Sequence, residues 1–201
     1  MRYVDRIARA LAFVLLFVAF TDGGAAEFAA PVDDGWHVWH VQGIEDGANA
    51  CCYRWRNGNA TNQGCDLDGN NGQSITLGDC DLDGDKVSVY VRIKAGELTK
   101  VRALASDCPV ATQTPVNDMG VVANAASVTW LALQIDAKRR VSEDAIAAIS
   151  AHAGDEAFAT LTDLLEDRNR TMKTREQALF WLAQRDSDRA FEYLDALISR
   201  N

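Results

Sequence analysis

The chain has 201 residues, 48% of them hydrophobic, and a formal net charge of −9. This length allows one medium domain or two small ones. The acidic balance argues against a nucleic-acid-binding protein, because phosphate groups require a basic surface, and it disfavours binding to anionic membranes.

Residues 1–26 have the three parts of a secretory signal peptide. A head with three arginines precedes an apolar run at 10–20, and Gly24-Ala25-Ala26 supplies the small residues of a cleavage site. The apolar run is shorter than the roughly 20 residues of a membrane span, although an uncleaved anchor is the alternative. We therefore expect a periplasmic or secreted protein without membrane contact after cleavage.

Residues 27–108 have the pattern of a small antiparallel β domain. Strands are expected where β-branched and aromatic residues alternate with others, at 35–42, 51–56, 74–77, 86–94 and 97–106. Within 86–94, the three valines and Ile93 share one face and more polar residues take the other, which is typical of a half-buried strand. Residues 57–72 are expected to be a Gly- and Asn-rich connector, and 109–120, with two prolines, a linker.

All five cysteines precede the predicted helices, and in an exported protein they are expected to form disulfides. They are Cys51, Cys52, Cys65, Cys80 and Cys108. Because five is odd, at least one cysteine is left over. Cys51 and Cys52 are expected to point to opposite faces of a strand, and Cys65 could pair with either, so the connectivity stays open. A thiol metal site is the rival interpretation, but no Cys-x-x-Cys spacing supports it.

Residues 121–201 contain an internal repeat with a period of 33. The segment 145–165 aligns without a gap on 178–198, and apolar residues match apolar residues along both. Stacked helical hairpins have this pattern, because a single unit cannot bury its own apolar face. The expected elements are a helix at 122–135 and two hairpins at 142–167 and 174–200.

The second hairpin resembles the short bacterial HEAT-like repeat. In 175–197, a Leu/Trp-rich helix is followed by a turn with Asp and Arg and by a helix that begins Ala-Phe, and Trp130-Leu131-Ala132 resembles Trp181-Leu182-Ala183. The period is shorter than that of standard HEAT units, so another helical-hairpin array is the alternative.

The mature chain as a whole resembles a group of exported bacterial proteins that join a cysteine-bearing N-terminal region to HEAT-like hairpins. The residues that carry this resemblance are Cys51-Cys52, Cys65-Asp66-Leu67, 89–93, Asp107-Cys108-Pro109-Val110 and Trp130-Leu131. We therefore expect an α+β protein, in which a small antiparallel, disulfide-stapled β region precedes a short HEAT-like α-helical repeat array. The resemblance implies this architecture and export, and it implies no activity.

The acidic loop 79–85 matches the opening of a calcium-binding loop, with carboxylates at positions 1, 3 and 5 and a glycine at position 6. The candidate ligands are Asp79, Asp81 and Asp83, with help from Asp66 or Asp68. Position 12 is Tyr90 where a bidentate Glu is expected, and the flanking segments are predicted strands. An acidic, solvated turn is therefore the alternative.

No nucleophile–base pair, zinc-protease motif or phosphate-binding glycine loop occurs in the sequence, so we expect no enzyme. The expected function is binding of a protein partner by the helical repeats, in a process such as envelope signalling. The residues expected to contact the partner are Arg175, Gln184, Arg185 and Arg189. A calcium-binding structural domain and a thiol-redox protein are the alternatives. His152 lies near a predicted helix end, where a positive charge is favoured.

Overall fold

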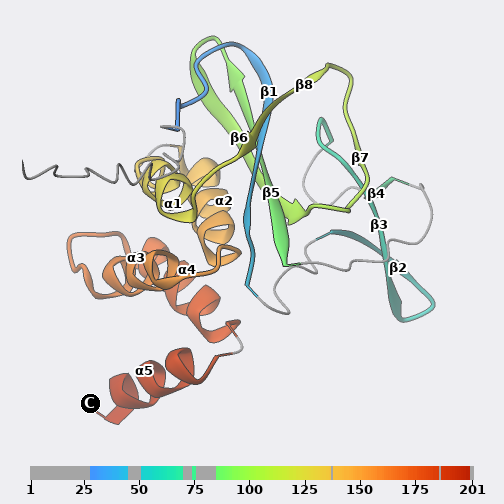
Figure 1. Cartoon of the computed structure of the whole chain (residues 1–201). Helices are drawn as coiled ribbons and strands as arrows, with labels where there is room; N and C mark the ends of the chain where they lie inside the picture. Colours follow the sequence, from blue (N-terminus) through green and yellow to red (C-terminus); the bar gives the residue numbers. More distant parts are fainter. Residues whose placement is uncertain are drawn as a thin grey trace, which may run out of the picture.

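The computed structural model of the chain describes residues 28–44, 51–69, 74–75, 85–136, 138–185 and 187–199 (Figure 1). The predicted signal peptide at 1–26 lies outside these ranges. Cys80 and the predicted calcium ligands, Asp79, Asp81 and Asp83, also lie outside them. Calcium binding by the acidic loop therefore stays a prediction.

The described part of the chain has strands followed by helices. The strands are β1 Gly35–Gln42, β2 Cys52–Arg56, β3 Asn59–Asp66, β4 Ser74–Ile75, β5 Lys86–Lys94, β6 Glu97–Ala105, β7 Val110–Ala111 and β8 Val116–Val121. The helices are α1 Asn124–Ala132, α2 Arg139–Ser150, α3 Asp155–Glu166, α4 Met172–Ala183 and α5 Asp188–Ser199. The protein thus has the expected α+β content.

These elements form three layers. A central sheet with the strand order β6-β5-β1-β8 has the helices on one face and a smaller sheet of β2, β3, β4 and β7 on the other (Figure 1). The apolar residues of the central sheet therefore divide between two cores. The helix-side core contains Trp39, Val41, Val87, Val89, Val91 and Val101, and the other contains Trp36, Val38, Tyr90, Leu104 and three cysteines.

The predicted strands at 35–42, 86–94 and 97–106 are confirmed as β1, β5 and β6. The prediction that β5 is half-buried is wrong, because Ser88 and Tyr90 are buried as well as the valines on the opposite face. The smaller sheet covers the face that was expected to meet solvent. The alternation along β5 thus separates two different cores, one on each side of the strand.

The prediction that residues 57–72 form a connector is also wrong, because this segment contains β3. Asn57 and Gly58 have positive φ angles of 54° and 80° and form the two-residue turn of a β2–β3 hairpin. Such turns favour Asn-Gly, because both central residues need positive φ. The Asn57-Gly58 pair was therefore a usable signal for this hairpin in the sequence.

Residues 109–120 were expected to be a linker, but they contribute β7 and β8 to the two sheets. β8 runs parallel to β1, with Val116 opposite Trp36, and β7 runs parallel to β3, with Val110 opposite Cys65. The β region is therefore mixed and not purely antiparallel. These short segments gain their backbone hydrogen bonds from strands far away in the sequence, which local composition does not reveal.

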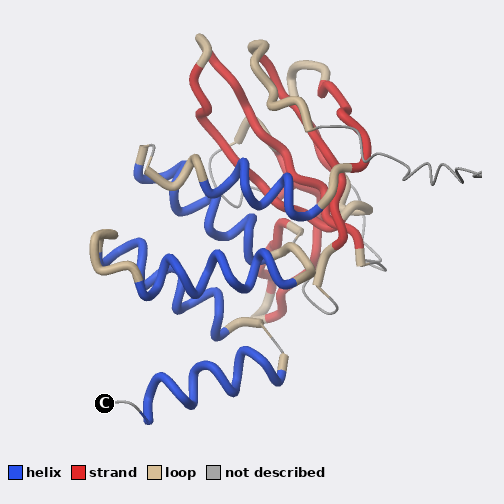
Figure 2. The backbone as a smooth tube through the Cα atoms, turned by 60° about the vertical axis from the view of Figure 1, so that its left-hand side comes forward, coloured by secondary structure: helices blue, strands red, loops and turns tan. Residues whose placement is uncertain are grey.

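The helix bounds repeat with the 33-residue offset of the sequence. α2 and α4 begin at Arg139 and Met172, and α3 and α5 begin at Asp155 and Asp188. The first unit begins three residues before the expected position 142. α3 packs against α1 and α4, and α2 packs against β6 and α4. α5 lies at the end of the helical layer farthest from the sheets (Figure 2). No helix in the described ranges combines the length and the apolar character needed to span a membrane.

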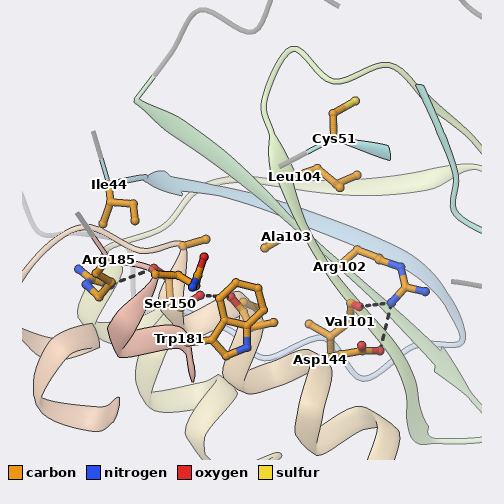
Figure 3. Close-up of a pocket in the computed structure, with 14 residues that line it drawn as sticks. Ile44, Cys51, Val101, Arg102, Ala103, Leu104, Asp144, Ser150, Trp181 and Arg185 are labelled. Atoms are coloured by element: carbon orange, nitrogen blue, oxygen red, sulfur yellow. Dashed lines mark hydrogen bonds and ion pairs between the residues drawn. The ribbon is translucent and has the colours of Figure 1, made fainter. Parts of the chain in front are cut away.

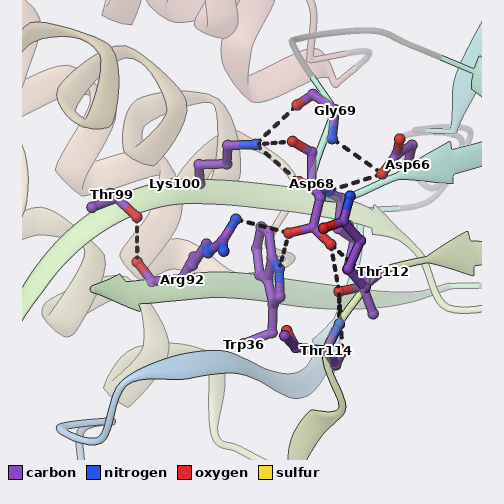
Figure 4. Close-up of polar contacts among 11 residues, drawn as sticks. Trp36, Asp66, Asp68, Gly69, Arg92, Thr99, Lys100, Thr112 and Thr114 are labelled. Atoms are coloured by element: carbon purple, nitrogen blue, oxygen red, sulfur yellow. Dashed lines mark hydrogen bonds and ion pairs between the residues drawn. The ribbon is translucent and has the colours of Figure 1, made fainter. Parts of the chain in front are cut away.

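Asp68, in the turn after β3, joins the smaller sheet to the central one (Figure 4). Its Oδ1 accepts hydrogen bonds from Trp36 Nε1 at 3.0 Å and from Arg92 Nη1 at 2.7 Å. Its Oδ2 accepts from Thr112 Oγ1 at 2.9 Å and from the backbone N–H of Gln113 at 2.6 Å. Desolvation alone would raise the pKa of Asp68, but these donors outweigh it and lower the pKa to about 2.

Replacement of this carboxylate by an amide tests its role in joining the layers. Both carboxylate oxygens accept hydrogen bonds, so the NH₂ group of Asp68→Asn would face a donor and lose at least one of these bonds. We expect this variant to lower the free energy of unfolding by about 3 kcal/mol. Urea-induced unfolding at pH 7, followed by tryptophan fluorescence, measures this change. Asp163→Asn, at an exposed position on α3, is the matched control. Equal stabilities of the two variants would contradict this role.

Candidate functional site

The cysteines at the interface of the two sheets form two disulfides. Cys51 pairs with Cys108, and Cys52 pairs with Cys65, so the adjacent cysteines have different partners as expected. The sulfur atoms of Cys65 and Cys108 lie 3.9 Å apart, and with Cys51 Sγ they form one group within 4.8 Å. All three residues are buried. Cys51 Sγ is bonded to Cys108 Sγ, and Cys65 Sγ is bonded to Cys52 Sγ, so this group consists of disulfide sulfurs and not of free thiolate ligands.

The turn that contains Asp66 and Asp68, the expected helpers of the calcium loop, already holds a cation. Lys100 Nζ donates to the carbonyl oxygens of Leu67, Asp68 and Gly69 at 3.1, 2.9 and 2.9 Å (Figure 4). Asp66 Oδ1 accepts from the backbone N–H groups of Asp68 and Gly69 and so closes the turn. The two carboxylates and the carbonyl oxygens are therefore engaged within the chain.

His152 is fully buried between the central sheet and the helices. Its Nε2 is 2.7 Å from Ser127 Oγ, which also accepts a hydrogen bond from Trp39 Nε1, and its Nδ1 is 2.8 Å from the carbonyl oxygen of Ala148. Burial, aided by the charge of Arg185, lowers the pKa of His152 to about 4. The expectation of a positive charge here is therefore wrong, because desolvation outweighs the helix dipole.

Three of the four predicted partner-binding residues contact other parts of the chain. Arg175 Nε donates to the carbonyl oxygen of Leu165 at the end of α3, at 2.8 Å. Arg189 pairs with Asp155 and lies over the Phe158 ring, 4.2 Å from its centroid. These contacts connect the second helical unit to the first. Whether either arginine also contacts a partner stays a prediction.

The other two predicted residues, Gln184 and Arg185, line a cavity of about 480 Å³ between β6 and the helices α2 and α4 (Figure 3). Arg185 Nη1 donates to the carbonyl oxygens of Ser150 and His152 at 2.9 and 3.2 Å. Burial lowers the pKa of Arg185, with a smaller effect from the charge of Arg189. The structure thus brings two of the four residues together at one hollow.

The cavity wall is mainly apolar. Alanines of α2 and the residue after it, together with the indole of Trp181, form the helical side. The Trp181 Nε1 atom is buried and has no hydrogen-bond partner in the described part of the chain. The volume of this cavity and its lining are within the range of small-molecule binding sites, which are typically apolar with a few polar groups.

A charged pair marks the other end of this cavity. Arg102 Nη1 of β6 lies 3.1 Å from Asp144 Oδ2 of α2. Burial raises the pKa of Asp144, although the charge of Arg102 opposes this shift. Arg102 and Asp144 could not be found from the sequence, because no local pattern indicates that β6 and α2 are neighbours.

A second surface feature is the set of exposed apolar side chains on the neighbouring helices α4 and α5, which we call the α4–α5 face. The exposed side chains are Leu179, Phe180, Phe191 and Ile198. Large apolar side chains that are exposed on a surface can mark sites that bind other macromolecules. This face is therefore the second candidate for a binding function.

A thiol count tests the disulfide assignment. With four cysteines paired, we expect one free thiol per chain when the mature protein is denatured without reductant and titrated with a chromogenic thiol reagent. After reduction, the count should rise to five. Three or more thiols before reduction would contradict the two disulfides.

The lowered pKa of the buried His152 side chain predicts a specific dependence of stability on pH. Its folded pKa of about 4 is lower than the value of about 6.5 in an unfolded chain, so the unfolded state binds the proton more tightly. The free energy of unfolding should therefore fall by up to about 3 kcal/mol as the pH drops from about 6.5 to 4. Urea unfolding at several pH values measures this slope.

His152→Gln should remove most of this slope, whereas His40→Gln, at a partly exposed position, should retain it. Equal slopes in the two variants would show that another group causes the loss of stability.

Comparisons with known proteins add no relative to this picture. No protein-family model, no curated protein and no solved structure matches the chain.

Proposed function

We propose that the protein is an exported, non-catalytic binding module whose HEAT-like helical repeats bind an amphipathic helix of a protein partner. The two disulfides support a periplasmic or secreted location, because such bonds persist in oxidising compartments. The signal-peptide pattern at 1–26 supports the same location. A role in envelope signalling is suggested by the resemblance to exported HEAT-like proteins alone.

The observation that carries this proposal is a difference between equivalent residues of the two helical units. Phe158 and Leu165 on α3 correspond to Phe191 and Ile198 on α5 at the 33-residue offset. Phe158 and Leu165 are each 8% exposed, whereas Phe191 and Ile198 are 73% and 76% exposed. The same apolar face is thus covered in the first unit and uncovered in the second.

The first unit also indicates what kind of element fits such a face. α3 packs against α4, and the rings of Phe158 and of Tyr193 from α5 form a T-shaped pair with a centroid distance of 5.9 Å. Helices with apolar stripes therefore cover this face within the chain. A partner helix on α5 would continue the same packing by one step, as in stacked repeats and helix-in-groove recognition.

The neighbouring helix α4 also has exposed apolar side chains, which add to the surface available to a partner. Leu179 and Phe180 are exposed there, and Leu179 occupies the position of the buried Ile146 in the first unit. Phe180 and Trp181 pack edge to face at 5.1 Å, which fixes the orientation of the Phe180 ring. Preorganised aromatic side chains of this kind frequently dominate binding energy.

Charge reversal of the apolar face tests the proposal. The mature protein, carrying an affinity tag, is incubated with envelope extract, and bound proteins are identified by mass spectrometry. A photo-crosslinking residue at position 191 then identifies the contacting segment of the partner. We expect Phe191→Glu and Ile198→Glu to reduce capture at least about tenfold, because each buries a charge in the interface.

Leu133→Glu is the matched control, because Leu133 is also exposed, at 74%, but lies after α1 and outside this face. It should retain capture. Capture that is unaffected by the α5 variants, or crosslinks that map to a segment without helical periodicity, would contradict the proposal. Sedimentation of the purified protein that shows a dimer, lost in both α5 variants, would identify a second copy as the occupant and would also contradict it.

A further inference from the structure

The cavity described above lies along the free edge of the central sheet. β6 is the first strand in the order β6-β5-β1-β8, so one of its sides pairs with β5, and the other pairs with no strand of the described ranges. Four consecutive residues, 101–104, line the cavity. Successive side chains of a strand point to opposite faces, so a hollow that contacts all four runs past the strand's edge and its backbone.

The hydrogen-bond pattern shows which backbone groups point outward. Ser106 N–H donates to the carbonyl oxygen of Lys86, and Tyr90 lies opposite Arg102 in the same register. In an antiparallel ladder the hydrogen-bonded residues alternate, so Arg102 and Leu104 bond to β5. The N–H and C=O groups of Val101 and Ala103 therefore face the cavity.

Few of these outward groups are used within the described part of the chain. The Val101 carbonyl oxygen accepts a hydrogen bond from Arg102 Nη1 at 2.9 Å. The N–H and C=O groups of Ala103 have no hydrogen-bond partner in the described part of the chain, and they adjoin the cavity. An exposed edge with unpaired backbone groups is a template for an added strand.

The shape of the cavity limits which kind of segment can bind there. α2 and α4 form one wall, and Cys51 and Leu104 lie on the opposite side (Figure 3). The edge from residue 101 to 104 is about 10 Å long at about 3.3 Å per residue. A volume of about 480 Å³ admits a few extended residues, whereas walls on both sides of the edge exclude a second sheet.

The charges in the cavity favour an acidic side chain on that occupant. Arg102 is paired with Asp144, but Arg185 donates only to carbonyl oxygens and forms no ion pair in the described ranges. Arg185 and Arg102 lie at opposite ends of the cavity, with Trp181 and Ser150 between them (Figure 3). A partly buried guanidinium without a carboxylate gains most from an incoming one.

We infer that β6 binds an extended peptide segment of another protein as an additional strand, with an acidic side chain of that segment on Arg185. Val101 and Ala103 supply the backbone hydrogen bonds, and the alanine-lined wall of α2 accepts the apolar side chains. This site is separate from the helical face of α4 and α5, and it takes an extended segment where that face takes a helix.

Selection from a phage-displayed library of random heptapeptides, followed by synthesis of the enriched sequences, tests this inference. We expect enriched peptides to alternate β-branched residues and to contain an Asp or Glu. Bound peptide should slow amide hydrogen exchange at Val101 and Ala103. Replacement of the peptide's acidic residue by its amide should weaken binding about tenfold, whereas amidation of its C-terminus should have no effect.

Two protein variants address the groove directly. Ala103→Pro removes an outward N–H without breaking a bond to β5, and Ala147→Leu fills the wall of α2. Each should weaken peptide binding at least about tenfold. Ala159→Leu, at an exposed position on α3, is the control for the added side chain and should bind as the unchanged protein does. Thermal unfolding of each variant verifies that it is folded.

The inference is overturned if no peptide is enriched over an unrelated disulfide-bonded protein, or if bound peptides leave exchange at Val101 and Ala103 unchanged. It is also overturned if folded Ala103→Pro and Ala147→Leu both bind normally. Phe191→Glu should not alter peptide binding. These results are independent of capture by the α5 face, so either site can fail without the other.

Discussion

Burial of the β1–β5 strand pair on both faces is the constraint on which the other layers depend. Helices cover one face and the smaller sheet covers the other, so every polar group on these strands needs a partner inside the protein. Trp39 Nε1 and Ser127 Oγ form one such pair, and His40 Nδ1 and Ser88 Oγ form another. The two sides of the central sheet are therefore specified by different polar contacts as well as by shape.

Charged groups in this acidic protein are used extensively for internal connections. The Asp68 carboxylate collects donors from the central sheet and from the segment between β7 and β8, and the Lys100 ammonium occupies the carbonyl cradle of the adjacent turn. Arg175 and Arg189 connect the two helical units in a comparable way. A charged residue that resembles a surface binding residue in sequence can thus also form contacts within the fold.

The surfaces that remain available have complementary character. The α4–α5 face offers exposed aromatic and aliphatic side chains, which suit a helix, whereas the edge of β6 offers backbone groups beside Arg185, which suit an extended acidic segment. Stacked helices and an open sheet edge both provide preorganised surfaces that need no loop to become ordered. The two proposed modes of recognition would thus both start from a centre that two disulfides hold together.

Local patterns in the sequence determined the elements that depend on neighbouring residues. Alternating valines specify β5, turn chemistry after Lys94 specifies the β5–β6 hairpin, and the 33-residue period gives the spacing of the last four helices. These features follow from backbone periodicity, so a single segment carries enough information.

Only the tertiary structure decided the contacts between segments that are distant in the chain. The parallel position of β8 beside β1, the pairing of Cys51 with Cys108, the neutral state of His152 and the meeting of β6 with α2 are of this kind. Each depends on which surfaces face one another after folding, and desolvation and pairing energies act only once those surfaces have met.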